Sequence, residues 1–133
     1  MLDDRGALID DFKDIFSIEL PDADFEPYER VNDALDAIEK GGEWDIWIVD
    51  LMMARGRFTA IETEDGLSTG VRVIERLNSA NAVKCRIIAY TLRDVTHEEH
   101  FENNTDVMIC PKKDFTVTEI VKIVRDLLME STK

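Results

Sequence analysis

The sequence has few of the residues that mark linkers, disulfide scaffolds and membrane segments. Its 133 residues include only three prolines, six glycines and two cysteines. No low-complexity tract and no linker rich in proline, glycine and serine divides the chain. Cys85 and Cys110 lie in separate apolar segments without metal-ligand spacing, which predicts free thiols in a reducing cytoplasm. No apolar run is long enough to span a bilayer, and the acidic start "MLDDRG" does not resemble a signal peptide.

Positive charge is also scarce. The chain carries 16 lysines and arginines against 29 aspartates and glutamates, a formal net charge of −13. Such a surface repels phosphate backbones, so we expect no direct contact with nucleic acid, and the sequence indicates no membrane partner. Hydrophobic residues make up 44% of the sequence, which is enough for the core of a single domain spanning residues 1–133.

Strand-like and helix-like segments alternate along the chain. Three apolar runs, "WDIWIVD", "CRIIAYT" and "DVMIC", have the composition of buried strands, and "FEPYERV" is a polar candidate for an edge strand. The predicted helices are "RGALIDDFKDIFSIEL", "NDALDAIEKGG", "VRVIERLNS", "THEEHFEN" and "TVTEIVKIVRDLLMES". The last two begin with the capping-box pairs Thr96/Glu99 and Thr116/Glu119. This alternation predicts an α/β fold with a parallel sheet.

Polar residues stand where these strands end. Asp50 follows the first apolar strand, Thr91 ends the second and Lys112 follows the third. Because the carboxyl ends of parallel strands meet at one edge of a sheet, we expect these three residues to lie together, with Asp3 and Asp4 beside them. Clustered carboxylates repel one another, and Mg²⁺ removes the conflict. Such a set of groups suits transfer of a phosphoryl group to an aspartate.

In this order the segments resemble the receiver domain of two-component response regulators. The resemblance rests on "DD" before the first helix, "IVDLMM" around Asp50, "IIAYT" ending in Thr91 and "CPKKDF" around Lys112, and it covers nearly the whole chain. It implies a flavodoxin-like, three-layer αβα fold with a parallel sheet of order 2-1-3-4-5. It also implies a cytoplasmic signalling domain that is not an enzyme beyond its own phosphorylation.

The resemblance assigns roles to particular residues. Asp50 would accept a phosphoryl group from a histidine kinase or a phosphotransfer protein, and the phosphorylated domain would act on a downstream protein target or output domain. Thr91 and Lys112 would contact the phosphoryl group. The implied magnesium ligands are Asp3, Asp4, Asp50 and the backbone carbonyl of Met52, with Asp4 favoured over Asp3 as the direct ligand.

The last strand and its lysine depart from the family's pattern. Ile109 occupies the place of the usual switch aromatic, which puts an aromatic-rotation readout in doubt. The proline that often follows the lysine is absent, and Pro111 precedes it instead. Lys113 is therefore an alternative to Lys112, although a solvated side chain is the favoured interpretation of Lys113.

The connection from Met53 to Ser68 is longer than receivers usually have. It has few apolar anchors beyond Phe58 and Ile61, so we expect a mobile loop that governs access to the site. Arg55 and Arg57 in this segment could attract an incoming phosphodonor or could simply keep the loop soluble.

The first strand of the implied sheet is largely missing or truncated, because only Met1 and Leu2 precede the acidic pair. Its loss would leave backbone groups of two neighbouring strands without partners. We therefore expect either an apolar strand upstream of Met1 or a segment from elsewhere, such as a second copy in a homodimer. We also expect Asp3 and Asp4 to be poorly fixed, and the Met1 ammonium to weaken Mg²⁺ binding.

Two other classes of function remain open. A pseudo-receiver would keep the fold and bind a partner protein without being phosphorylated. A haloacid-dehalogenase-like phosphatase also uses an aspartate after a parallel strand, but it needs a second acid two residues on, where this chain has Met52. His97 and His100 indicate an exposed helix face rather than a metal site.

Overall fold

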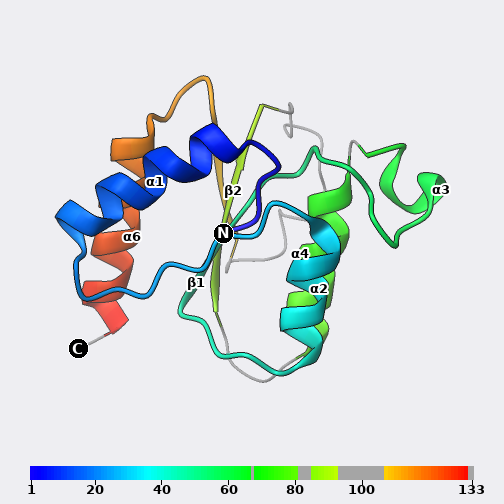
Figure 1. Ribbon diagram of the computed structural model, residues 1–133, viewed down its shortest axis with the longest axis horizontal. Helices are drawn as coiled ribbons and strands as arrows, with labels where there is room; N and C mark the ends of the chain where they lie inside the picture. Colours follow the sequence, from blue (N-terminus) through cyan, green and yellow to red (C-terminus); the bar gives the residue numbers. More distant parts are fainter. Residues whose placement is uncertain (67, 81–84, 93–106, 132–133) are drawn as a thin grey trace.

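Three apolar segments form an open, all-parallel sheet of order β1-β2-β3. The strands are β1 (Ile46–Val49), β2 (Arg86–Thr91) and β3 (Val107–Pro111). The computed structural model in Figure 1 describes residues 1–66, 68–80, 85–92 and 107–131. The predicted α/β class and the three predicted apolar strands are confirmed.

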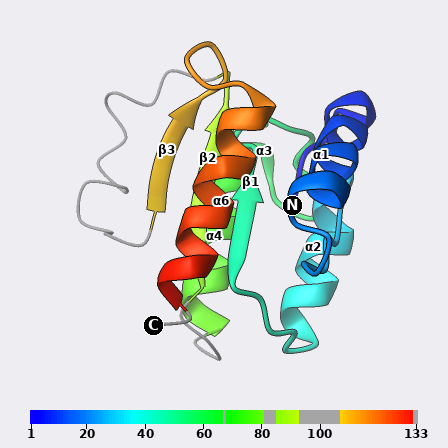
Figure 2. The same ribbon diagram turned by 90° about the vertical axis from the view of Figure 1, so that its left-hand side faces the viewer.

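Helices cover both faces of this sheet. Their bounds are α1 (Gly6–Glu19), α2 (Val31–Glu39), α3 (Ala60–Thr63), α4 (Thr69–Ala80) and α6 (Val117–Ser131). Figures 1 and 2 show α1 and α6 on one side of the sheet and α2 and α4 on the other. The predicted capping box before α6 is present, because the Glu119 N–H donates to Oγ1 of Thr116 and the Thr116 N–H to Glu119. The predicted capping box at Thr96/Glu99, with its helix and its two histidines, lies outside the described residues.

Side chains of successive strand residues point to opposite faces of the sheet, so each face has its own hydrophobic core. Trp47 and Val49 of β1 pack with α2 and α4, while Ile48, between them in the sequence, packs with α1 and α6. Successive strand residues point to opposite faces, so a strand covered on both sides is apolar at every position. Cys110 of β3 is buried in the second core as a free thiol, and burial raises its pKa to about 11.

The first residues of the chain lie alongside β1 but form only single-residue bridges. The Leu2 N–H donates to the Ile48 carbonyl at 2.8 Å, and the Asp50 N–H donates to the Leu2 carbonyl at 2.9 Å. On its other side Leu2 forms a parallel bridge with Tyr28. The polar strand predicted for "FEPYERV" is thus reduced to one bridge at Tyr28. Leu2 is therefore bridged to Tyr28 on one side and to Val49 of β1 on the other.

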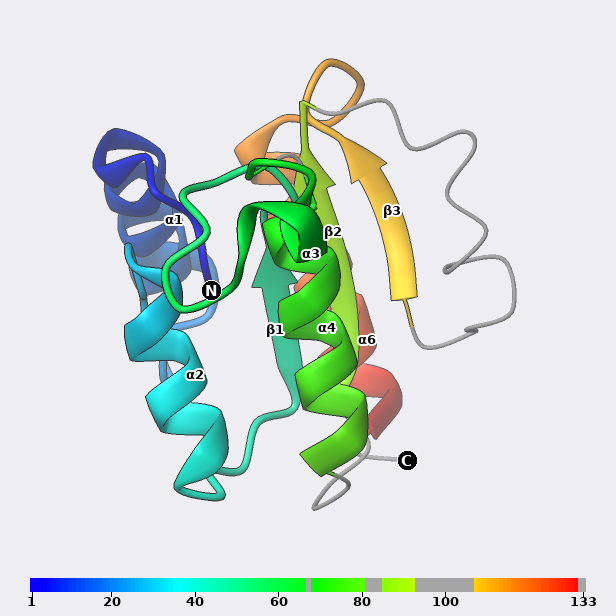
Figure 3. The same ribbon diagram turned by 90° about the vertical axis from the view of Figure 1, so that its right-hand side faces the viewer.

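The long connection between β1 and α4 contains a short helix where the sequence predicts only a loop. Thr59 caps α3 through a capping box with Glu62, and α3 lies beside α4 (Figure 3). Phe58 is buried as an anchor, whereas Ile61, the other expected anchor, is 92% exposed. In the described residues, no helix combines the length and the apolar character that a bilayer crossing requires.

Candidate functional site

The carboxyl ends of the three strands bring the predicted polar residues together. Asp50 follows β1 directly, Thr91 is the last residue of β2 and Lys112 follows β3. The Lys112 N–H donates to the Thr91 carbonyl at 2.8 Å, which joins two of these ends. All three side chains are withdrawn from solvent, with Thr91 fully buried and Asp50 5% exposed.

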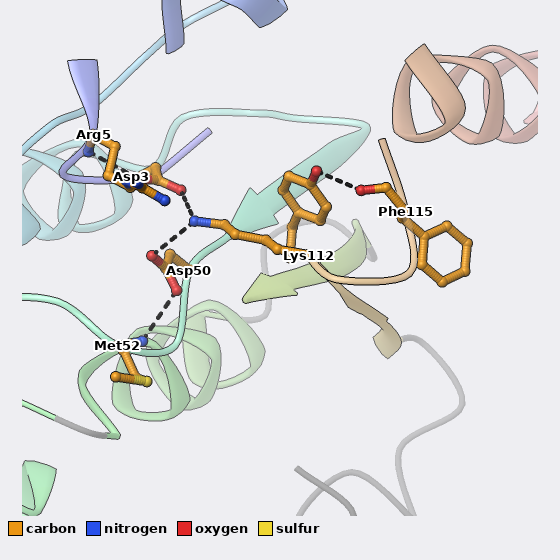
Figure 4. A network of polar contacts seen from close by, with 7 residues as sticks. Asp3, Arg5, Asp50, Met52, Lys112 and Phe115 are labelled. Carbon is orange, nitrogen blue, oxygen red and sulfur yellow. Dashed lines mark hydrogen bonds and ion pairs between the residues drawn. The ribbon is translucent and has the colours of Figure 1, made fainter. Parts of the chain in front are cut away.

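The Lys112 ammonium lies between two carboxylates (Figure 4). Its Nζ is 2.9 Å from Oδ2 of Asp3 and 3.3 Å from Oδ2 of Asp50. The same nitrogen lies 5.6 Å from the ring centroid of Tyr90, within the range of a cation–π contact. The Lys112 side chain is only 7% exposed, so these contacts are shielded from water. Lys113, the alternative lysine, is exposed and forms no ion pair with any described residue.

Opposing interactions set the pKa of Asp50. Burial raises this pKa, and the nearby negative charge of Asp3 adds to the increase. Lys112, the Met52 N–H at 3.2 Å and a hydrogen bond with the Thr91 side chain lower it. The net result is a pKa above the ordinary range for an aspartate. Additional positive charge at this carboxylate would therefore favour its ionised form.

The two N-terminal aspartates differ in their surroundings. Asp3 is 1% exposed, and its Oδ1 accepts a hydrogen bond from the Arg5 N–H at 2.9 Å. Asp4 is exposed, which makes it the more accessible of the two. One carboxylate oxygen from each of Asp3, Asp4 and Asp50 can be chosen so that all lie within 4.8 Å of one another. Three converging carboxylate oxygens could hold a metal ion.

At the start of the chain, the expectations for Asp3 and for the Met1 amino group are wrong, while the expectation for Asp4 stays a prediction. Asp3 is firmly held, because its backbone N–H donates to the Tyr28 carbonyl at 3.1 Å and its carboxylate contacts Arg5 and Lys112. The Met1 amino group donates to the Glu26 carbonyl at 2.9 Å, and burial lowers its pKa to about 5. It is therefore uncharged at neutral pH and does not compete with a cation.

The start of helix α4 holds the backbone that follows β1, through two residues that the sequence pattern does not indicate as part of the site. The Gly70 N–H donates to the Leu51 carbonyl at 3.0 Å, and Oγ1 of Thr69 donates to the Met53 carbonyl at 2.8 Å. In the sequence, this contact is marked only by a threonine and a glycine at the start of α4. The backbone that follows Asp50 is consequently tied down.

A shallow pocket of about 520 Å³ opens beside the carboxylate cluster. It is lined by Asp4, the segment from Met52 to Arg55, and Asp65 with Gly66. Arg55 thus shares a pocket with Asp4, whereas Arg57 pairs with Asp36 and Glu39 of α2. Asp65 was not anticipated, because nothing in its sequence context places it near Asp4.

Comparisons of the chain with protein-family models, with curated proteins and with solved structures found no match.

Proposed function

We propose that the chain is a phosphoacceptor receiver domain in which Asp50 takes up a phosphoryl group. The observation that carries this proposal is the position of the Lys112 ammonium, within 3.3 Å of Asp50 and 2.9 Å of Asp3, at the carboxyl edge of a parallel sheet. The hydrogen bond of Thr91 to Asp50 supports the same assignment. This set of groups provides a nucleophile, a cation and a hydroxyl in one shielded place.

The proposed chemistry is a single phosphoryl transfer. An Asp50 carboxylate oxygen attacks the phosphorus of the donor, a new P–O bond forms, and the bond between phosphorus and the leaving group breaks. The leaving group departs with the electron pair, as a carboxylate from an acyl phosphate or as an imidazole from a phosphohistidine. Lys112 donates a hydrogen bond to the phosphoryl oxygens, and the Thr91 hydroxyl donates another.

The carboxylate cluster fits a resident Mg²⁺. Asp3, Asp4 and Asp50 converge to within 4.8 Å, and burial together with the charge of Asp3 raises the pKa of Asp50, so a cation bound there would favour its ionised form. The proposed ligands are these three carboxylates and the Met52 carbonyl. Bound there, the ion would neutralise the carboxylates and the charge on the phosphoryl oxygens.

The proposal includes a flavodoxin-like sheet of order 2-1-3-4-5. The single-residue bridges support it, because Leu2 is paired with Tyr28 on one side and with Val49 of β1 on the other. Tyr28 and Leu2 then stand for strands 2 and 1, and β1, β2 and β3 stand for strands 3, 4 and 5. The proposed partners are a histidine kinase or phosphotransfer protein as donor and a protein target of the phosphorylated form.

A pseudo-receiver is the second candidate, and one observation favours it. Lys112 already bridges Asp3 and Asp50 and so compensates two of the carboxylates without metal or phosphoryl group. A phosphatase of the haloacid-dehalogenase type is disfavoured, because Met52 supplies no acid at the position where that chemistry needs one.

Labelling with acetyl phosphate separates the first two candidates. Wild-type protein incubated with acetyl phosphate and Mg²⁺ is expected to gain the mass of one phosphoryl group, and addition of EDTA should prevent this. Asp50→Asn should gain none. Asp45→Asn is the matched control, because Asp45 is exposed and precedes the same strand at its opposite end. Absence of labelling in the wild type would favour the pseudo-receiver, and equal labelling of Asp50→Asn would refute the choice of Asp50.

A further inference from the structure

Arg55 lines the pocket that also contains Asp4, and its side chain forms no ion pair or hydrogen bond with another described residue. Among the described residues that line this pocket, Arg55 alone carries a positive charge. Asp4 and Asp65 line the same pocket, yet neither forms an ion pair with Arg55. The guanidinium is exposed, so its donors are available to an anion from solution.

The backbone that follows Arg55 is held in place. Arg57 pairs with Asp36 and Glu39, which anchors the turn on α2. Gly56 has φ +56° and packs so closely that a β-carbon would lie 2.1 Å from a methyl group of the first residue of α2. The Phe58 N–H donates to the Arg55 carbonyl at 3.0 Å and closes the turn. Arg55 thus projects from an anchored turn.

The charge of the protein makes a cation at this place useful. A net charge of −13 and three clustered carboxylates repel any donor that carries a phosphoryl dianion. An arginine in the pocket that contains Asp4 opposes this repulsion locally, and its planar donors match phosphoryl oxygens. Asp65 lines the same pocket, and its negative charge acts against that of Arg55.

We infer that Arg55 is the residue that binds the phosphoryl group of the incoming donor before transfer, and that Asp65 weakens this binding. This inference rests on the proposed phosphorylation of Asp50. The ligand is defined by its chemistry, a phosphoryl dianion on an acyl or imidazole leaving group. Arg55 is a binding residue here, while Lys112 and Thr91 contact the group during transfer.

The test compares initial rates of labelling at subsaturating donor in the presence of Mg²⁺. Arg55→Gln is expected to be roughly 3- to 10-fold slower than wild type, with the difference shrinking at high salt. Asp65→Asn is expected to be about 2- to 3-fold faster. Asparagine tolerates the left-handed conformation of Asp65, φ +58°, at least as well as aspartate. Arg76→Gln removes the same charge from an exposed site on α4 away from the pocket and should match wild type.

A second readout is independent of transfer. Because Arg55 repels a cation near Asp4, Arg55→Gln should bind Mg²⁺ slightly more tightly in calorimetry, and Asp65→Asn slightly more weakly. Slower labelling with unimpaired Mg²⁺ binding cannot come from a damaged fold, which would weaken both. If Arg55→Gln binds Mg²⁺ more weakly, its role is structural and the inference fails.

Two donors distinguish the phosphoryl group from the leaving group. A similar decrease with acetyl phosphate and with phosphoimidazole supports recognition of the phosphoryl group, and a decrease with only one overturns it. If the wild type is labelled and Arg55→Gln is labelled equally fast, the inference is wrong and the proposed function stands. If the wild type is not labelled at all, the proposed function itself fails.

Discussion

Gly70 lies against the end of β1 so closely that a β-carbon on it would fall 2.2 Å from the carbonyl oxygen of Asp50. Real β-carbons do not approach a backbone atom to this distance, and neither helix α4 nor a strand end can yield cheaply. The absence of a side chain at Gly70 therefore allows α4 to support the residue that we propose as phosphoacceptor.

Gly70→Ala is accordingly expected to destabilise the fold by about 2–4 kcal/mol, because the helix must move away from the strand end. Urea denaturation measures this. Gly6→Ala is the control, since its β-carbon would meet only the carboxylate end of Glu29, a flexible side chain, and alanine favours the helix. Equal stability of the Gly70 variant and wild type would show that the contact is loose.

Asp50→Asn is expected to raise the melting temperature at neutral pH by a few degrees. Burial raises the pKa of Asp50, so the ionised carboxylate is less favourable in the folded than in the unfolded chain. The wild-type protein is relieved of this cost as the pH falls through the raised pKa, and the advantage of the variant should then disappear. Thermal melts across this pH range, with Asp45→Asn as control, measure the effect. A variant less stable than wild type at neutral pH would contradict it.

Lys112→Gln should be strongly destabilising, by about 3–5 kcal/mol, because two buried carboxylates lose their cation. Mg²⁺ should restore more stability to this variant than it adds to wild type. Addition of Asp50→Asn should also recover part of the loss, since it removes one of the two charges. Lys113→Gln, at the exposed neighbour, should change little. If both lysine variants denature at the same urea concentration, the buried ion cluster contributes no net stability.

Much of the fold could be predicted from the spacing of apolar residues in this one sequence. The runs at Ile46–Val49 and residues 87–90 are apolar on both faces, which is typical of strands buried between two layers of helices. Val71, Ile74 and Leu77 lie at helical spacing on α4, and all three are buried. By contrast, the strand predicted around Tyr28 is reduced to a bridge, because Leu2 is the one residue with which it pairs in the described part of the chain.

The site was predictable only as far as strand ends define it. Asp50, Thr91 and Lys112 each follow or end an apolar run, so the rule about carboxyl edges brings them together. The positions of Gly70 against Asp50 and of Asp65 beside Asp4 depend on how the long connection after β1 folds. That connection has no apolar periodicity from which its path could be predicted. The contact between Lys112 and the ring of Tyr90 likewise depends on tertiary packing.

The connection after β1 is expected to be protected from hydrogen exchange only where its own bonds hold it. The Thr63 N–H donates to the Thr59 carbonyl at 3.2 Å, and the Asp65 N–H to the Ala60 carbonyl at 2.8 Å. Thr59→Ala removes the cap of α3, worth about 1 kcal/mol, and should speed exchange at Thr63 and Asp65. Exchange in β2 should not change. Unchanged protection in the variant would mean that packing of Phe58, not the cap, holds the segment.

The segment before α1 offers a test of how the sheet could be extended. A groove of about 590 Å³ continues from Met1 along β1 and is lined by Ile46, Ile48, Phe25 and Glu26, among others. Ile48 already accepts a hydrogen bond from Leu2, and Ile46 presents the same edge two residues earlier. A short apolar strand fused ahead of Met1 should therefore extend the pairing into this groove.

We expect that fusion to raise the melting temperature by several degrees for two separable reasons. New strand pairing stabilises the fold at every pH. The fusion also replaces the buried amino group of Met1, whose pKa is lowered to about 5 from 8.0, with a peptide. That group makes the unextended chain lose stability as the pH falls from 8 towards 5, because only the unfolded chain is readily protonated there. The stability gained by fusion should therefore grow at the acidic end of this range.

Mg²⁺ affinity should stay the same in the fusion, because Asp3 is already fixed by Arg5 and Lys112. A polar fusion of equal length is the control for strand pairing. If the polar and apolar fusions melt at the same temperature, the groove does not accept a strand.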